Sequence, residues 1–555
     1  MKLLYSILLI AISIATINCM SITSVEQEIK EKFTTGSVAT CVVNNKVSSC
    51  SSTPNAYVCP SIISCIRLFN QSQQTQNYQV LISAGSYGPN DCPGYLGVLQ
   101  FPGSISFIGY NGLVDIQCGS SQFLTLNVGS NPIDIMFDNL SIKGKAEYNG
   151  GAIAIGGNSR SALASTLLFS NVISNGSYAG GYGGFAYCSF GKVYVLNSTF
   201  AGNTAQSGGG VISAPYGQVV SIQSNYYQNT IYDEEGGAIY SSSANLINST
   251  FIGNNAYMAG AVATIYLMDV VNSTFIENHC SFTGGAIYSL NGINVYGSTF
   301  QYNSAGNGGA IFGINITIGL SSFQGNQAQF SGAGGAVYAD AENPIQMVVV
   351  NSTFDQNSAD GIGGAIYTIQ TSIFLTGCVF TYNNANNSGG ALYIGYRSDI
   401  AQVDIINSLL TDNYAALDGG AIYLYQLNSL EGPFMVNLYG TILDRNTAGN
   451  YAGGLYFLGY PKQLIGGQFV NSISNEPGSY TFYSLSVQGV NKANITLPYA
   501  HEPYFVTIYD EQSFSYYKAI GVIGSCFNGV AQINDDGYIL SCSCFAGATG
   551  PSCDN

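Results

Sequence analysis

Hydrophobic and polar residues alternate in short runs along the chain, and these runs recur in a fixed order between Val172 and Tyr456. Each unit places an aromatic or aliphatic residue three positions before an Asn and then continues into a Gly-rich corner and another alternating run. Eleven such Asn residues follow one another at intervals of 23 to 33 residues. Since self-similarity at a fixed period indicates a repeat architecture, we expect one structural unit per period. The second part reads Gly-Gly-Ala followed by Ile, Val or Leu in the copies that begin at Gly236, Gly284, Gly308, Gly334, Gly363, Gly389 and Gly419.

The repeat predicts strands and not helices. Runs such as Asn248-Ser249-Thr250-Phe251 alternate with a period of two and are bounded by Gly and Asn, which is typical of strands broken by turns. About 25 residues of strand and turn suit one coil of a parallel β-helix. We therefore predict an all-β fold, a right-handed parallel β-helix of the pectin-lyase-like solenoid class. Its coils must stack, because one coil buries too little apolar surface to fold alone.

The period of two also assigns faces to the side chains. Ser249 and Phe251 share one face of their strand, and Asn248 and Thr250 share the other. If Phe points inward, the first Asn points out. The second Asn, three residues after Phe, is expected at a corner with left-handed backbone, where its amide can pair with the same Asn of the neighbouring coils. This predicts a ladder of structural asparagines: Asn203, Asn229, Asn254, Asn278, Asn303, Asn326, Asn357, Asn383, Asn413 and Asn446.

Tyrosines follow many of the Gly-rich corners. By strand alternation they face away from the preceding Ile, so the pattern predicts an outward aromatic stripe that includes Tyr240, Tyr288, Tyr338, Tyr367 and Tyr423. Such a stripe can hold a glycan or a partner protein. The alternative, which we favour, is stacking between coils that only stabilises the sheet.

The N-terminus has the pattern of a secretory signal peptide over residues 1–19. Lys2 precedes an apolar run, from Leu3 to Ile14, that is too short to span a membrane. No later segment reaches a spanning length without polar interruption, and we expect neither a transmembrane segment nor a lipid anchor. The expected location is extracellular, either secreted or peripherally associated with a cell surface.

Cysteine positions and the fading repeat suggest the domain boundaries. Residues 20–120 are expected to form a disulfide-rich N-terminal cap and the first coils, with short helices over 27–32 and 60–69. The repeats cover 121–456, and the last coils and a C-terminal cap cover 457–522. Cysteines clustered at both ends indicate disulfides in an oxidising compartment, with the N-terminal connectivity left open. Cys188, Cys280 and Cys378 lie at different repeat positions and are expected to be buried small hydrophobes.

Charge and composition limit the partners. Charged residues make up 8% of the chain and the net charge is −16, so nucleic acid and anionic membranes are poor partners. An extracellular glycan or surface protein is the expected partner. Ten N-glycosylation sequons are present, although an Asn- and Ser-rich chain also generates sequons by chance. They begin at Asn70, Asn139, Asn175, Asn197, Asn248, Asn272, Asn315, Asn351, Asn386 and Asn494.

The sequence gives little support for a catalytic function. A polysaccharide lyase or hydrolase needs clustered carboxylates, and the best candidates are Asp355, Asp412 and Asp444, which follow the Phe position in three coils. The run from Asp233 to Glu235 is more typical of a solvated turn, and His279 of a partly exposed turn residue. We expect no catalytic residue, metal site or cofactor.

The alternation of Phe-x-x-Asn with Gly-Gly-Ala-Ile resembles the double motif of the polymorphic outer-membrane autotransporter passengers, over about 285 residues. Members of that family present a β-helix at the cell surface and act as adhesins, so the resemblance implies adhesion. We expect no C-terminal membrane barrel. Together with the sequons, this favours a eukaryotic secreted or surface-associated relative.

The end of the chain, residues 523–555, resembles the closing half of an EGF-like module. The spacing Cys542-x-Cys544-x5-Gly550-x2-Cys553 carries this likeness, and two of the six cysteines of a full module are absent. The resemblance implies the disulfides Cys544–Cys553 and Cys526–Cys542. The sequence thus predicts a non-catalytic β-helix that acts as an adhesion or glycan- and protein-binding rod, with a polysaccharide lyase or hydrolase as the alternative.

Overall fold

The computed structural model describes residues 38–458 except for 45, 54–55, 73–76, 98–102, 128–131, 157–164, 397–401 and 427–434. It also describes four residues between Gln27 and Phe33 and, beyond 458, the backbone of several strands. The expected signal peptide and both expected C-terminal disulfides lie outside the described residues. Among the residues that are described, no helix is long and apolar enough to cross a bilayer.

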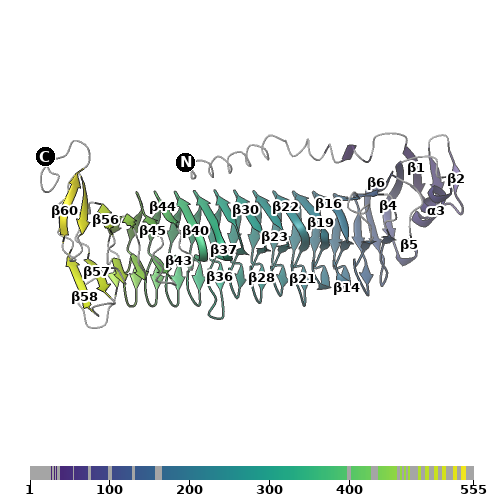
Figure 1. Cartoon of the computed structure of the whole chain (residues 1–555). Helices are drawn as coiled ribbons and strands as arrows, with labels where there is room; N and C mark the ends of the chain where they lie inside the picture. Colours follow the sequence, from purple (N-terminus) through teal and green to yellow (C-terminus); the bar gives the residue numbers. More distant parts are fainter. Residues whose placement is uncertain are drawn as a thin grey trace. The chain divides into compact units, whose positions relative to one another are not determined.

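The chain is an all-β parallel β-solenoid, as predicted, and it divides into two units. Unit 1 comprises Met1–Ser281 with Ala286–Leu290, and unit 2 comprises Phe282–Gly285 with Asn291–Asn555. Within each unit, corresponding strands of successive coils pair in parallel and in register, as the coloured arrows in Figure 1 show.

The coils of unit 1 contain four kinds of strand. Corner strands follow the Gly-rich corner: β7 (Leu124–Asn127), β11 (Ile153–Gly156), β15 (Ala186–Cys188), β19 (Ile212–Ile222), β22 (Ile239–Ile247), β25 (Val262–Thr264) and β29 (Ile287–Ser289). Phe strands carry the Phe position: β13 (Ile173–Asn175), β17 (Thr199–Ala201), β20 (Asn225–Tyr227), β23 (Thr250–Ile252) and β27 (Thr274–Ile276). Short strands follow the ladder position, which Ser177 occupies before β14 and Asn before the others: β14 (Tyr178–Tyr182), β18 (Thr204–Ser207), β21 (Thr230–Ile231), β24 (Asn255–Ala256) and β28 (His279–Cys280). Further strands precede the Phe strands: β8 (Ile133–Asp138), β12 (Thr166–Ser170), β16 (Phe190–Leu196) and β26 (Leu267–Val271).

Unit 2 repeats this arrangement. Its corner strands are β33 (Ile311–Gly313), β37 (Val337–Val350), β40 (Ile366–Thr376), β43 (Leu392–Tyr396), β47 (Ile422–Gln426) and β51 (Leu455–Leu458). Its Phe strands are β31 (Thr299–Gln301), β35 (Ser322–Gln324), β38 (Thr353–Asp355), β41 (Val379–Thr381), β45 (Leu409–Thr411) and β49 (Ile442–Asp444). Its short strands are β32 (Ser304–Ala305), β36 (Gln327–Ala328), β39 (Ser358–Ala359), β42 (Asn384–Ala385), β46 (Tyr414–Ala415) and β50 (Thr447–Ala448). Later strands pair antiparallel, β57 (Phe505–Asp510) with β58 (Ser515–Ile520) and β59 (Gly529–Ile533) with β60 (Ile539–Cys544).

The Phe positions form the core, as predicted. Phe251 is fully buried, and its ring stacks on those of Tyr226 and Phe275 with centroids 4.5 and 4.8 Å apart. In unit 2, Phe323 stacks on the Phe of the coil before it and the coil after it at 4.8 and 4.7 Å. These separations match the spacing of parallel strands, so the inward rings follow the strand register directly.

The expectation of left-handed backbone at the ladder Asn was wrong. Positive φ occurs one residue earlier, for example at Glu277 (53°) and Tyr302 (54°), and at the first Asn of the motif, as at Asn248 (48°). The chain therefore turns just before the ladder position. The Asn itself is left with its side chain directed into the coil.

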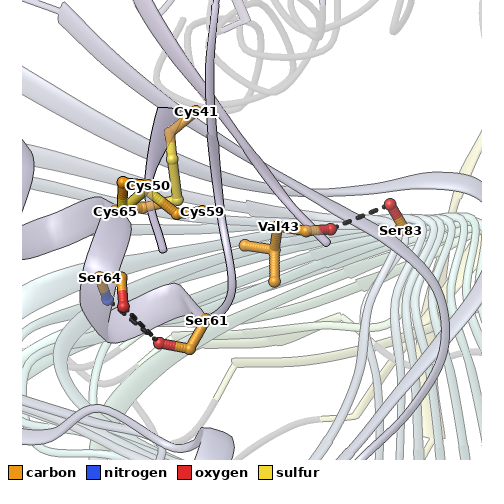
Figure 2. The surroundings of a disulfide bond; sticks show 8 residues. All are labelled: Cys41, Val43, Cys50, Cys59, Ser61, Ser64, Cys65 and Ser83. Carbon is orange, nitrogen blue, oxygen red and sulfur yellow. Dashed lines mark hydrogen bonds between the residues drawn. A yellow bond between two sulfur atoms is a disulfide. The ribbon is translucent and has the colours of Figure 1, made fainter. Parts of the chain in front are cut away.

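The N-terminal cap combines one helix with three disulfides. Helix α3 (Ile62–Ser72), predicted over 60–69, buries a stripe at the i, i+3, i+4 and i+7 positions that starts at Ile62 and ends at Phe69. A disulfide ties Cys65 of α3 to Cys41 of β1 (Val38–Val43), as Figure 2 shows. The other two disulfides are Cys50–Cys59 and Cys92–Cys118.

Local hydrogen bonds fix the start of α3 and its neighbouring strands. The Ser61 hydroxyl accepts a hydrogen bond from the Ser64 amide, at 3.2 Å, which satisfies one of the open amides at a helix start. The Ser83 hydroxyl of β4 (Asn77–Tyr87) donates to the Val43 carbonyl of β1, at 3.0 Å (Figure 2). The helix, tied to β1 by the Cys41–Cys65 disulfide, thus lies against the first described strands.

Candidate functional site

A continuous row of aromatic side chains covers the outer face of the corner strands in unit 2. The first residue of each of these strands is buried in the core, and the next one points outward. Successive outward rings stack with centroids 4.6 to 5.4 Å apart. The row, called here the tyrosine row, consists of Phe312, Tyr338, Tyr367, Tyr393, Tyr423 and Tyr456.

Stacking determines what the tyrosine row can offer to a ligand. Because the ring faces lie against each other along the row, ring edges and phenol hydroxyls are what the row presents. Burial raises the pKa of Tyr393 to about 12 and also raises that of Tyr423. The hydroxyls therefore stay neutral at physiological pH. The row combines apolar edges with groups that both donate and accept hydrogen bonds.

In unit 1 the outward positions of the corner strands alternate between large and small residues. Their order, from register, is Tyr187, Ser213, Tyr240, Ala263 and Tyr288. Ser213 is fully buried although it lies on the outer face, and its hydroxyl has no hydrogen-bond partner among the described residues. The rings around it therefore cover the gap that the small side chain leaves.

Two glutamates lie beside these rings. The Tyr182 hydroxyl donates to Glu234 Oε1 at 3.2 Å across two coils, and the Gly208 amide lies 3.5 Å from Glu234 Oε2. A Cβ at Gly208 would lie 2.9 Å from the Tyr240 ring and 3.3 Å from the Tyr182 ring, so both rings lie over this glycine. We call Tyr182, Tyr216, Tyr240, Glu234 and Glu235 the tyrosine–glutamate cluster.

Burial and mutual repulsion disfavour the charged carboxylates of the tyrosine–glutamate cluster. Burial, and next the charge of Glu234, raise the pKa of Glu235. Burial and both carboxylates raise the pKa of Tyr240 to about 12. Asp233 is exposed, as a solvated turn predicts, but Glu234 and Glu235 are half-buried. The interpretation of all three acids as a solvated turn was therefore wrong for the two glutamates.

The ladder asparagines form hydrogen-bonded rows inside both units. In unit 1, Asn203 Nδ2 donates to Asn229 Oδ1 at 3.0 Å, and the same bond joins Asn229 to Asn254 and Asn254 to Asn278 at 2.9 Å. In unit 2 the same Nδ2-to-Oδ1 hydrogen bond is 2.8 to 3.0 Å long and joins successive members of the row Asn303, Asn326, Asn357, Asn383, Asn413 and Asn446. The side chains are buried, so the rows have a structural role and no contact with solvent.

The sequence did not lead us to predict a second hydrogen-bonded row, which is formed by serine hydroxyls. The Ser beside each inward Phe accepts a hydrogen bond from the backbone amide of the preceding coil, as Ser249 does from Ser224 at 3.3 Å and Ser273 from Ser249 at 3.1 Å. Cys378 occupies this position in its own coil, and burial raises the pKa of its thiol to about 11. The sequence signal was available, because Gly-Cys-Val-Phe aligns with Asn-Ser-Thr-Phe.

Sequon asparagines lie mostly on the surface. Asn248 and Asn70 are half-buried, and the Asn494 side chain lies outside the described part of the chain. The Asn197 amide donates to Asn171 Oδ1 at 2.7 Å. The exposed sequon asparagines are Asn139, Asn175, Asn197, Asn272, Asn315, Asn351 and Asn386.

Of the three carboxylate candidates for catalysis, the structure brings Asp412 and Asp444 together at Arg445 and leaves Asp355 apart. Asp355 and Asp444 occupy one column, but Thr381 and Thr411 separate them in the strand register. Asp412 and Asp444 both form ion pairs with Arg445, and hydrogen bonds from its guanidinium hold the pKa of Asp412 below its usual range.

The remaining candidates are scattered. His279 is exposed on β28, in register with Asn255. Cys280 is buried in an alanine position, with Ala256 as its neighbour, and Cys188 is buried with the pKa of its thiol raised to about 12 by burial. Both cysteines are small buried residues, as expected.

Two segments, residues 197–215 and 351–369, match the repeat family described as "Chlamydia polymorphic membrane protein repeat". These two coils match the polymorphic membrane protein repeat. Each matched segment begins at the first Asn of the motif and runs through the Gly-rich corner into the corner strand. The repeat therefore combines the inward Phe, the ladder Asn and the outward position after the corner, as the sequence resemblance predicted.

Two known proteins are similar to this chain over longer stretches. "Probable autotransporter YfaL" of Escherichia coli K12 is 33% identical over 222 residues, which cover 32% of this chain and 17% of that protein. "Probable outer membrane protein pmp20" of Chlamydia pneumoniae is 28% identical over 279 residues, 40% of this chain and 16% of that protein. The matches thus span less than a fifth of either relative.

Proposed function

We propose that this chain forms a surface-exposed β-helix that acts as an adhesion rod, binding an extracellular glycan or surface protein. The tyrosine row carries this proposal. It spans six consecutive coils, and its half-buried members Tyr338, Tyr393 and Tyr423 present apolar edges and neutral hydroxyls, which are groups suited to a partner with mixed polarity. The likeness to an autotransporter and an outer-membrane protein supports a location at a cell surface.

The test is binding of the full chain to glycan and surface-protein arrays. Tyr393→Ala removes a ring from the middle of the tyrosine row, and we expect at least about a fivefold loss of signal, since a central aromatic residue often dominates an interface. Tyr382→Ala is the matched control, because Tyr382 is 59% exposed and lies outside the row. Equal binding by both variants, or no binding by the unaltered chain, contradicts the proposal.

We further propose N-glycosylation at the exposed sequons when the chain is secreted by a eukaryotic host. Asn351 and Asn272 lie at left-handed corners with exposed side chains, where a glycan would meet solvent. Peptide mapping after glycosidase treatment should find deamidated Asn at these positions. An unmodified chain would contradict this part of the proposal and leave the binding role to be tested separately.

A further inference from the structure

Glu235 is the least compensated charge of the tyrosine–glutamate cluster. Its carboxylate is half-buried and lies close enough to Glu234 for the two charges to repel each other. Neither carboxylate forms an ion pair with any residue that the structure describes. Two negative charges at a partly desolvated site favour a positive group that joins them.

Ser213 provides a second, independent observation. Strand register places it between Tyr187 and Tyr240 on the outer face, so its side chain points into the cluster. It is fully buried, yet its hydroxyl has no partner among the described residues. A buried hydroxyl without a partner is costly, which indicates a group that is satisfied when a ligand is present.

The aromatic rings select the kind of cation. Tyr216 is 64% exposed and Tyr240 is half-buried beside the glutamates, so a cation at Glu235 would lie against aromatic faces or edges. A calcium ion takes six to eight oxygen ligands, and two carboxylates among phenol rings supply few of them. An organic ammonium group combines charge with an apolar stem that packs on tyrosine.

We propose that the tyrosine–glutamate cluster binds a primary alkylammonium group. Its N–H bonds are donated to the carboxylates of Glu234 and Glu235 and to the Ser213 hydroxyl oxygen, and its alkyl stem packs on Tyr216 and Tyr240. In the proposed complex the Tyr240 side chain adopts another rotamer, which opens the way to Ser213. Lysine side chains of a protein partner and free diamines share this chemistry. The site does not depend on the tyrosine row, so it can bind its ligand whether or not the adhesion proposal holds.

The experiment is a titration of the full chain with Nα-acetyl-lysine methylamide, putrescine and choline, followed by saturation-transfer NMR at constant ionic strength. The first two probes have primary ammonium groups, and choline has the same charge without an N–H donor. We expect both primary amines to bind at least about threefold more tightly than choline. Tighter binding of the lysine derivative indicates a protein source, and tighter binding of putrescine indicates a free diamine. Equal binding of choline, or no binding of any probe, overturns the proposal.

Three variants separate recognition from folding. Glu235→Gln should weaken binding of the lysine derivative about tenfold, since a charge-assisted hydrogen bond is lost, and Glu147→Gln is the control because Glu147 is an exposed acid of the same unit. Ser213→Ala should not lower stability, because it removes a hydroxyl that has no partner, but it should bring binding of the lysine derivative down to the level of choline. Unchanged binding by both Glu235→Gln and Ser213→Ala would show that the cluster has only a structural role.

Discussion

Replacing Asn254 by Ala removes one member of the ladder in unit 1. The Asn254 side chain accepts hydrogen bonds from the Asn229 amide nitrogen and from Asn229 Nδ2, at 3.1 and 2.9 Å, and it donates to the Tyr226 carbonyl at 3.0 Å. The substitution strands these three groups in a site with no solvent exposure. Asn278 Oδ1 keeps the hydrogen bond from the backbone amide of residue 254.

The expected loss is large compared with the stability of a domain. Each stranded buried group costs about 1–3 kcal/mol, and a water molecule that enters the space lowers the total, so we expect about 3–5 kcal/mol. Asn255→Ala is the matched control, since Asn255 is the next residue and is exposed. An exposed change of this kind should alter stability by no more than about 0.5 kcal/mol.

Two measurements check this prediction. Guanidinium unfolding followed by circular dichroism gives the change in stability. Native-state hydrogen exchange should show lost protection of the Asn229 backbone amide, because its acceptor is gone. If Asn254→Ala and Asn255→Ala unfold at the same denaturant concentration, the ladder does not stabilise the coils as described here.

Further outcomes follow from single positions. Gly237→Ala should prevent stable folding, because the new Cβ would lie 2.0 Å from the Gly260 carbonyl oxygen; soluble expression with a normal circular dichroism spectrum would refute this. Cys378→Ser should stay within about 1 kcal/mol of the unaltered chain in guanidinium unfolding, since serine fills this position in other coils. Arg445→Ala should return the pKa of Asp412 upward toward its usual range in an NMR titration. Because the pKa of Asp412 is lowered in the folded state, its ion pair with Arg445 stabilises the fold above the unfolded-state pKa of Asp412. This stabilisation is lost as the pH falls through the folded-state pKa. We therefore expect a small loss of stability at pH 7 that vanishes in acid, and a loss that does not depend on pH would refute this.

The sequence predicted the parallel coils and the inward Phe positions because both follow from periodicity alone. Phe251 recurs at the coil period, so parallel register brings its ring onto those of Tyr226 and Phe275 without further information. The buried state of Cys378 was expected on other grounds, because a free cysteine commonly acts as a small buried hydrophobe. Alternation also gave the outward direction of the tyrosines, and the stacking that we favoured is what unit 2 contains.

The repeat period does not predict contacts that depend on how far a side chain extends from its own coil. Tyr182 and Glu234 are 52 residues apart and meet across two coils only because Gly208, between them, has no side chain. A run of three acids has the composition of a solvated turn, and composition does not report that two of them face tyrosines. The left-handed positions were misplaced by one residue, because Glu277 and Tyr302 are residue types that rarely adopt this conformation.

The asparagine rows have a polarity: each Asn-to-Asn hydrogen bond runs from an Nδ2 to the Oδ1 of the following coil, and Ser174 donates to the first acceptor, Asn203 Oδ1, at 2.9 Å. A complete coil can therefore be inserted or deleted anywhere within a row without creating an unmatched donor or acceptor. Evolution can lengthen or shorten such a protein by duplication of whole repeats, whereas a partial repeat would break the chain of bonds at the point of insertion.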